Sequence, residues 1–280
     1  MSRAHYELYA RCFPAYPLTY EQFCSMTGIE NSAVVLDEKA EDELVGFAVV
    51  GCNNISVIAV SKEHRNRGVG ARLLKRAEEI LKEKGEKEIF LGRGSNSIFQ
   101  GVPMDNDGQD VSDFFAKRGY TKSHITYNMD IDTANFEYSA LTIPKPENVT
   151  YRFATEADKD ALLAAVEQVV PEWVGLYKGY CGEVLLALCD GEIAAFEMIE
   201  ERGGFFCANA KKHGSIGCVG TVPKFRRRGI GLDMTAQSVR ILKARGCDRV
   251  QLLYLVFDKW YGKLGFEITS TQWMGSMKLE

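Results

Sequence analysis

The chain has 280 residues, of which 46% are hydrophobic, so it can fill one large core or two medium-sized cores. Its formal net charge is −4, and its isoelectric point is near 5.7. This balance leaves no basic surplus for binding a nucleic acid or an anionic membrane surface, and it argues against both as the main partner.

The eight cysteines stand singly, without the paired spacing of a zinc site or a redox motif, and are typical of reduced thiols. No amino-terminal stretch joins a basic head to an apolar run, and no window reaches the roughly 18 apolar residues of a membrane span. We therefore expect a cytoplasmic protein without a metal site. The oligomeric state stays open.

The first half of the chain predicts a helix over residues 5–12 and strands over residues 43–47 and 55–60. The second strand runs into Arg-Asn-Arg-Gly-Val-Gly at residues 65–70, which we call the first turn. A helix follows, with one apolar face made of Leu73, Leu74, Ala77, Ile80 and Leu81. Gly85 suits its left-handed C-terminal cap, and residues 88–91 predict the next strand.

Residues 92–110 are rich in Gly, Asn, Ser and Asp and predict a loop at the active end. Phe-Phe-Ala-Lys-Arg-Gly-Tyr at residues 114–120 predicts a short helix, a Gly-aromatic pair and a final strand. Residues 132–148 lose periodicity and contain Pro144-Lys-Pro146, which cannot lie inside a central strand or helix. The predicted boundary is near residue 140, with domains at 1–140 and 141–280.

The second half opens with a strand over residues 149–153 and a helix capped by Thr155, with Asp158 three positions later. A strand over residues 192–196 and an extended hairpin over residues 202–214 are expected next. A strand over residues 216–222 then runs into Arg-Arg-Arg-Gly-Ile-Gly at residues 226–231, the second turn. A helix capped by Gly246, a strand over residues 249–254 and Trp-Tyr-Gly-Lys-Leu-Gly-Phe at residues 260–266 complete the half.

The two halves repeat one another. Arg65, Gly68, Gly70 and Gly85 recur 161 residues later as Arg226, Gly229, Gly231 and Gly246. Each half therefore predicts strand, turn, helix and strand, with parallel strands joined by a right-handed crossover. The expected fold is α/β (α+β), with two tandem domains, each carrying a mixed and mostly antiparallel sheet.

Both turns have the composition of a phosphate site. A strand that enters a glycine turn and then a helix points several backbone N–H groups, and the positive end of the helix dipole, at one spot. The structural alternative is a tight strand-to-helix connection, but two copies in register favour binding. Neither turn continues to the dinucleotide or P-loop signature.

These residues resemble the GNAT superfamily of N-acetyltransferases in a tandem form. Both turns match its acetyl-CoA pyrophosphate motif, and residues 260–266 are similar to its Leu-Tyr-x-Lys-x-Gly-Phe ending. The resemblance implies a sheet that splays open beside the strand before each turn, direct attack of an amine on the thioester, and no metal. Acetyl-CoA is the implied cofactor, with a small-molecule or peptide amine as acceptor.

The expected cofactor-binding residues lie on the strand ends and the two turns. In the first half they are Ile58, Ala59, Val60, Arg65, Asn66, Arg67, Gly68, Val69, Gly70 and Ala71. In the second half they are Val219, Gly220, Thr221, Val222, Arg226, Arg227, Arg228, Gly229, Ile230, Gly231 and Leu232. Arg226, Arg227 and Arg228 are either phosphate ligands or a solvated basic turn.

The resemblance implies a tyrosine that protonates the departing thiolate, and this position falls on Tyr261. The first half has Phe115 there, which has no proton to give, so the second half is favoured as the catalytic one. Tyr261 could instead be a core aromatic. Glu197 is the candidate base and Asp258 a weaker one, although an ordinary strand carboxylate and a helix cap explain them equally.

Three hypotheses stay open. The second half is catalytic and the first a degenerate copy; or the first half binds acetyl-CoA and works without a tyrosine; or the protein is a non-catalytic acyl-CoA sensor. In such folds the least regular segments build the acceptor pocket. Here these are residues 13–29, 92–110, 171–182 and 202–214.

Overall fold

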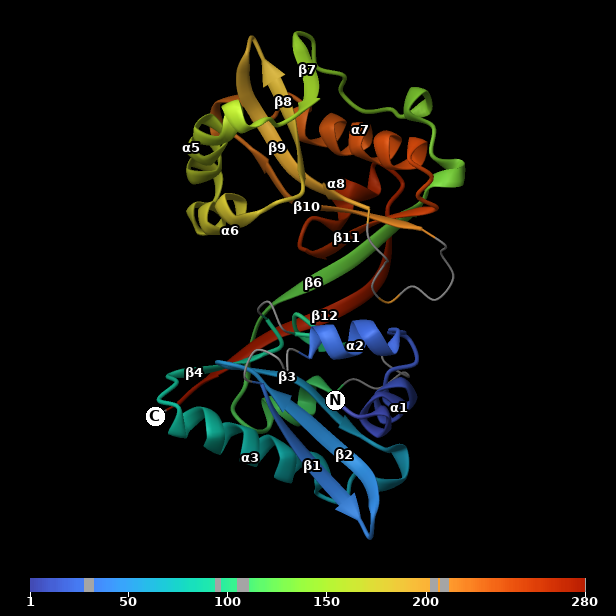
Figure 1. Ribbon diagram of the computed structural model, residues 1–280, viewed down its shortest axis with the longest axis vertical. Coiled ribbons are helices and arrows are strands. Elements are labelled where there is room, and N and C mark those ends of the chain that lie inside the picture. Colours follow the sequence, from blue (N-terminus) through green and yellow to red (C-terminus); the bar gives the residue numbers. More distant parts are fainter. Residues whose placement is uncertain (28–32, 94–96, 105–110, 202–205, 207–211, 280) are drawn as a thin grey trace. The chain divides into compact units, whose positions relative to one another are not determined.

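The computed structural model describes residues 1–27, 33–93, 97–104, 111–201, 206 and 212–279. The chain divides into two compact units (Figure 1). The first contains residues 1–127, 205–208 and 270–280, and the second contains residues 128–204 and 209–269. No helix among the described residues is long and apolar enough to cross a membrane.

The first unit begins with α1 (Arg3–Cys12) and α2 (Tyr20–Met26), followed by β1 (Val34–Ala40), β2 (Glu43–Val50) and β3 (Asn54–Val60). A 3-10 turn (Lys62–His64) leads through the first turn to α3 (Val69–Glu83) and β4 (Glu88–Leu91). The short elements β5 (Val102–Pro103) and α4 (Ser112–Ala116) precede β6 (Thr121–Asp132). The predicted helix over residues 5–12 and the predicted strands of this half are confirmed.

The sheet of the first unit is mixed. The strands β1, β2 and β3 pair in antiparallel order, and β3 pairs with β4 in parallel. The other neighbour of β4 is the carboxyl-terminal part of β12 (Glu267–Lys278), which also pairs with β5. A strand from the end of the chain therefore belongs to the first unit.

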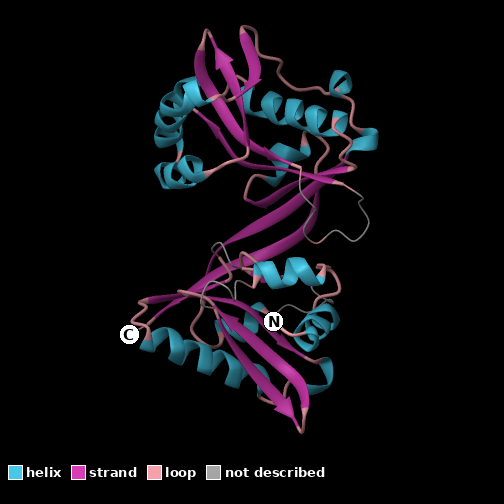
Figure 2. Ribbon diagram, in the orientation of Figure 1, coloured by secondary structure: helices cyan, strands magenta, loops and turns pink. Residues whose placement is uncertain are grey.

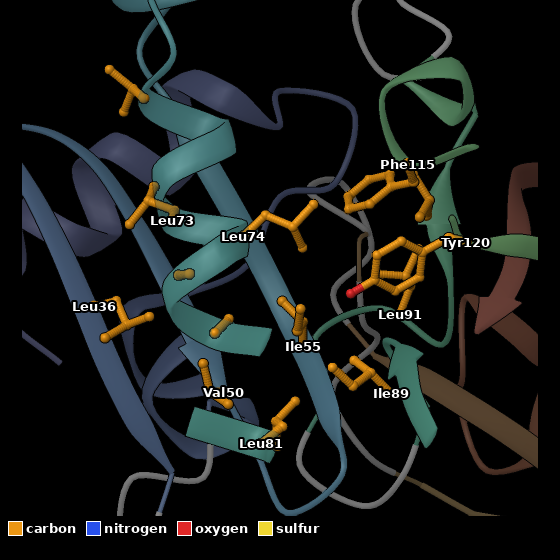
Figure 3. Packing of buried hydrophobic residues seen from close by; sticks show 14 of the residues in the cluster. Leu36, Val50, Ile55, Leu73, Leu74, Leu81, Ile89, Leu91, Phe115 and Tyr120 are labelled. Carbon is orange, nitrogen blue, oxygen red and sulfur yellow. The ribbon is translucent and has the colours of Figure 1, made fainter. Parts of the chain in front are cut away.

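Two cores cover the two faces of this sheet. On one face, α3 packs Leu73, Leu74, Ala77 and Leu81 against strand side chains such as Ala48 and Ile55. Figure 3 shows this cluster, with the Phe115 and Tyr120 rings on one side of α3 and Leu36 on the other. On the other face, α1 and α2 enclose an aromatic core that contacts Val57 and Ala59 of β3.

The second unit contains the end of β6, β7 (Val149–Phe153), α5 (Lys159–Val169), α6 (Val174–Gly179), β8 (Glu183–Cys189) and β9 (Glu192–Glu200). It continues with β10 (His213–Thr221), α7 (Ile230–Ala244), β11 (Arg249–Leu255), α8 (Asp258–Gly262) and the start of β12. Short 3-10 turns lie at Thr133–Asn135, Tyr138–Ala140, Glu156–Asp158, Pro171–Trp173 and Pro223–Phe225. The expected hairpin over residues 202–214 lies largely outside the described residues.

In the second unit β7, β8, β9 and β10 pair in antiparallel order, and β10 pairs with β11 in parallel. The end of β6 is the other neighbour of β11. The Asn128 side chain accepts a hydrogen bond from the backbone N–H of Tyr254 at 3.0 Å. Each predicted final strand exists, but the end of β6 pairs in the second unit while the end of β12 pairs in the first.

The predicted repeat is confirmed in three dimensions. The helices α3 and α7 have 15 residues each and lie along the sheets of their units (Figure 2). Gly85 and Gly246, just beyond them, have φ values of 81° and 82°. The opening strand at Val149–Phe153 and the Thr155/Asp158 capping box are also as predicted. The boundary near residue 140 stays a prediction, and the compact units instead change at residue 127, inside β6.

Candidate functional site

The first and second turns have the same backbone conformation. Asn66 and Gly68 have φ values of 60° and 80°, and Arg227 and Gly229 have φ values of 63° and 81°. Left-handed residues alternating with right-handed ones form a concave nest of N–H groups, and a helix N-terminus follows each nest. Both turns therefore have the backbone of an anion site.

The arginine that opens each turn ties it to the preceding strand. The Nε of Arg65 donates to the backbone oxygen of Val60 at 3.1 Å, and the Nε of Arg226 donates to that of Thr221 at 3.0 Å. Sequence analysis expected these arginines at a phosphate. In this structure their Nε atoms fix the strand end instead, and their contact with a cofactor stays a prediction.

The sheet opens beside each turn. The strands β3 and β4 pair only at Asn54 and Ile55, and β10 and β11 pair only from His213 to Ile216. Beyond those points β3 and β10 continue along one neighbour each. The splayed sheet implied by the family resemblance is present in both units.

In an antiparallel ladder, alternate residues bond to the neighbouring strand, and this decides which main-chain groups face the gap between the splayed strands. Ser61 donates its N–H to Val45, so Ala59 also faces β2, while the main chains of Ile58 and Val60 face the gap. In the second unit the N–H of Val222 bonds to Ala194. There the main chain of Thr221 faces the gap, and those of Gly220 and Val222 face β9, whereas Val219 lies in the register shift between Gly217 and Gly220.

A cavity of about 640 Å³ occupies the gap of the first unit. It is lined by the first turn and by residues 55–60 of β3. Cys12, Phe13 and Phe99, from the core on the face away from α3, also line it, as do Phe114 and Phe115 from the cluster on the α3 face. The lining of the cavity therefore contains residues from both faces of the sheet.

The wall of this cavity is mostly apolar and carries positive charge. Among the described lining residues, Arg65 and Arg118 are cationic and none is a carboxylate. The Cys12 thiol donates to the backbone oxygen of Val60 at 3.3 Å. Burial raises the pKa of Cys12, which keeps the thiol neutral.

Phe115 lines the cavity where the other half of the sequence has Tyr261. Its ring packs against the rings of Tyr120 and Trp273 (Figure 3 shows the first of these). The Tyr120 hydroxyl donates to Glu78 at 3.1 Å, so it is engaged on α3. Phe115 has no hydroxyl and that of Tyr120 is engaged, so neither side chain supplies the cavity wall with a free hydroxyl.

The second turn has closer neighbours than the first. A Cβ at Gly229 would lie 2.5 Å from the Cβ of Pro144, whereas at Gly68 it would meet only the Arg72 side chain, at 3.3 Å. Beside the splayed part of β10, the Tyr177 hydroxyl donates to the backbone oxygen of Cys218 at 2.7 Å. Pro144, which lies in the linker before β7, thus covers one side of the second turn.

Tyr261 is only 7% exposed and packs edge-on against Trp260 and Phe266. Burial, and then the nearby charge of Glu197, raise its pKa well above the ordinary phenol value, so it keeps its proton at neutral pH. Its role as a proton donor stays a prediction.

Glu197 lies in the core of the second unit and is 0% exposed. Thr235 donates to one carboxylate oxygen at 3.1 Å and Ser238 donates to the other, both from α7. Burial raises the pKa of Glu197 to about 7. The structure places this group within a hydrogen-bonded core cluster, and its role as a base stays a prediction. Asp258 begins α8, where an acidic residue suits the helix dipole.

Sequence reasoning did not single out Cys12, Phe13, Phe99 or Arg118, which line the cavity. Two of them, Phe13 and Phe99, fall in segments expected to shape an acceptor pocket. Within the described residues, no three potential metal ligands lie together.

A sequence model of the acetyltransferase (GNAT) family matches residues 2–98 and 150–266, which make up more than half of the chain. No curated protein sequence matches it significantly.

Several solved structures share the fold. The GCN5-related glucosamine N-acetyltransferase region of a fungal multi-domain beta-N-acetylglucosaminidase is 20% identical, with a TM-score of 0.80, over 97% of this chain and 36% of that one. A GCN5-related N-acetyltransferase from Sphaerobacter thermophilus is 19% identical, with a TM-score of 0.75, over 98% and 91%. A tandem GNAT protein from the clavulanic acid biosynthesis pathway is 12% identical, with a TM-score of 0.66, over 98% and 94%. The chain thus spans little more than a third of the fungal protein.

Proposed function

Since this chain belongs to the GNAT family of acetyltransferases, we propose that it transfers an acetyl group from acetyl-CoA to a primary amine of a small molecule or peptide. The amine nitrogen attacks the thioester carbon, a C–N bond replaces the C–S bond, and one proton passes from nitrogen to sulfur overall. No acyl-enzyme is needed.

The residues of the first turn fit the pyrophosphate of this cofactor. The turn conformation and the helix N-terminus direct the N–H groups of residues 67–71 toward one spot. A Cβ at Gly68 would meet only the Arg72 side chain, at 3.3 Å. The main chain of Ile58, which faces the gap, fits the amide groups of pantetheine, whereas the backbone oxygen of Val60 already accepts from Arg65 and Cys12. Bound there, acetyl-CoA supplies the acetyl group as a thioester.

We place catalysis in the first unit, which is the reverse of the preference given by sequence alone. The observation that carries this proposal is the cavity beside the first turn, which is lined by residues from both faces of the sheet. At the second turn, Pro144 lies against Gly229, which crowds the corresponding space. Because Phe115 has no hydroxyl, the proton passes from the attacking nitrogen to sulfur without a tyrosine.

A second candidate keeps catalysis in the second unit, with Tyr261 as proton donor and Glu197 as base. It is favoured by the hydroxyl of Tyr261, which Phe115 lacks. An acyl-CoA sensor without turnover is the third candidate.

Matched variants in the two turns separate these candidates. The three atoms nearest to a Cβ at Gly70 belong to Phe114 and Val60 and lie 3.5 Å or more away, so this position accepts a Cβ, and Gly70→Glu puts a carboxylate at the phosphate site. We expect it to abolish acetyl-CoA binding in calorimetry, and turnover with it. Gly231→Glu should leave both unchanged, once thermal unfolding has established that it folds, because Thr221 lies close to that position. Loss of binding in Gly231→Glu alone would place the site in the second unit.

A further inference from the structure

One wall of the cavity is aromatic. Phe13 and Phe99 line the cavity directly. Behind them, the Tyr16 ring meets Phe99 edge-on with centroids 5.2 Å apart, and Tyr9 packs on Phe13 at 5.2 Å. These side chains come from α1, the segment after it, and the loop after β4. They lie on the face of β3 away from α3.

The second half of the sequence contributes one ring to this wall. Phe206 belongs to the first unit. Its ring stacks on Phe99, with centroids 5.7 Å apart and planes 12° apart, and meets Tyr16 edge-on at 5.3 Å. Phe99 is therefore held between the cavity and Phe206.

The apolar lining of the cavity restricts the acceptor. None of the described lining residues is a carboxylate, and the two arginines lie by the first turn, Arg118 over the Phe114 ring that faces Gly70. Desolvation at the aromatic wall lowers the pKa of an amine, which favours the neutral, nucleophilic form of the reacting nitrogen. A second ammonium group on the same molecule would be disfavoured by the same desolvation.

Resting on the proposed function in the first unit, we propose that the acceptor is a primary monoamine on an apolar, preferably aromatic body, and that Phe206 positions Phe99 to select it. The aromatic body packs against Phe13 and Phe99, and its amine points toward the thioester. Phe206 is a positioning residue, because it acts through Phe99.

Three amines test the acceptor class with acetyl-CoA held at saturation. Hexylamine and hexamethylenediamine differ by one ammonium group, and phenethylamine adds a ring. We expect kcat/KM to be highest for phenethylamine and at least about tenfold lower for the diamine than for hexylamine. Preference for the diamine would overturn this inference while leaving the transferase in place. Binding of acetyl-CoA without turnover of any amine would instead overturn the proposed function.

Phe206 variants test the positioning role. Phe206→Ala should raise KM for phenethylamine by about tenfold, with a smaller change for hexylamine and an unchanged Kd for acetyl-CoA. Phe206→Trp, which restores a stacking ring, should recover most of the selectivity. Phe257→Ala, which removes an aromatic ring that is 67% exposed in the second unit, is the matched control and should change neither. An equal loss with both amines in Phe206→Ala, or no rescue by Trp, would contradict the role.

Discussion

The Trp273 ring stacks on the Phe115 ring, with centroids 6.3 Å apart and planes 26° apart. Trp273 lies on the last strand of the chain, whereas Phe115 lines the cavity of the first unit. The core beside the proposed site is therefore completed by the carboxyl-terminal segment.

Trp273→Ala should destabilise the first unit by about 3–5 kcal/mol, because it leaves a large void in a packed core. It should also weaken acetyl-CoA binding, since Phe115 loses its support. Denaturant unfolding and calorimetry measure the two effects. Trp173→Ala, at a half-buried site in the second unit, should cost less and leave binding unchanged. Equal effects of the two substitutions would contradict this assignment of β12.

Glu197→Gln should make the protein more stable at high pH. The pKa of Glu197 is about 7 in the folded protein and 4.5 in the reference state, so its protonated form is favoured by folding. This contribution is fully present below pH 4.5 and is lost as the pH rises through 7, by about 3 kcal/mol in all. The variant, which stays neutral, should lose less stability between pH 5 and pH 8 than the parent.

Thermal unfolding across that pH range measures the difference. Glu167→Gln, on the exposed face of α5, is the control and should follow the parent protein. Parallel stability curves for Glu197→Gln and the parent would show that the buried carboxyl does not control this pH dependence.

Tyr261→Phe should leave turnover unchanged at every pH if the first unit is catalytic. A general acid contributes about 10²- to 10⁴-fold to a rate, so its loss would be unmistakable. Steady-state rates with acetyl-CoA and the best amine, measured as a pH profile, decide the matter. A fall of this size with a shifted alkaline limb would favour the second unit instead.

Arg65→Lys should weaken acetyl-CoA binding by about tenfold, because lysine lacks the Nε–H that ties the first turn to Val60. The matched change Arg226→Lys removes the same bond in the second turn and should lower thermal stability without changing the Kd. Calorimetry on both variants checks the prediction. A weaker Kd in Arg226→Lys alone would point to the second turn.

Local sequence determined the repeated elements. A glycine at a position with positive φ, an apolar helix face and a glycine cap act over a few residues, so the two turns and the helices α3 and α7 could be located without tertiary information. The apolar strands before each turn were equally local signals. The site could be predicted to this extent, as two backbone nests beside two strand ends.

Only the tertiary structure decided which partners these elements meet. The residues of a strand do not identify the strand that it pairs with. The sequence therefore could not reveal that β12 pairs with β4 and that the end of β6 lies beside β11. The packing of Pro144 on Gly229, and of Phe206 on Phe99, likewise joins residues far apart in the chain. Tyr261 and Phe115 distinguish the two halves in sequence, but the open space beside each turn depends on these long-range contacts.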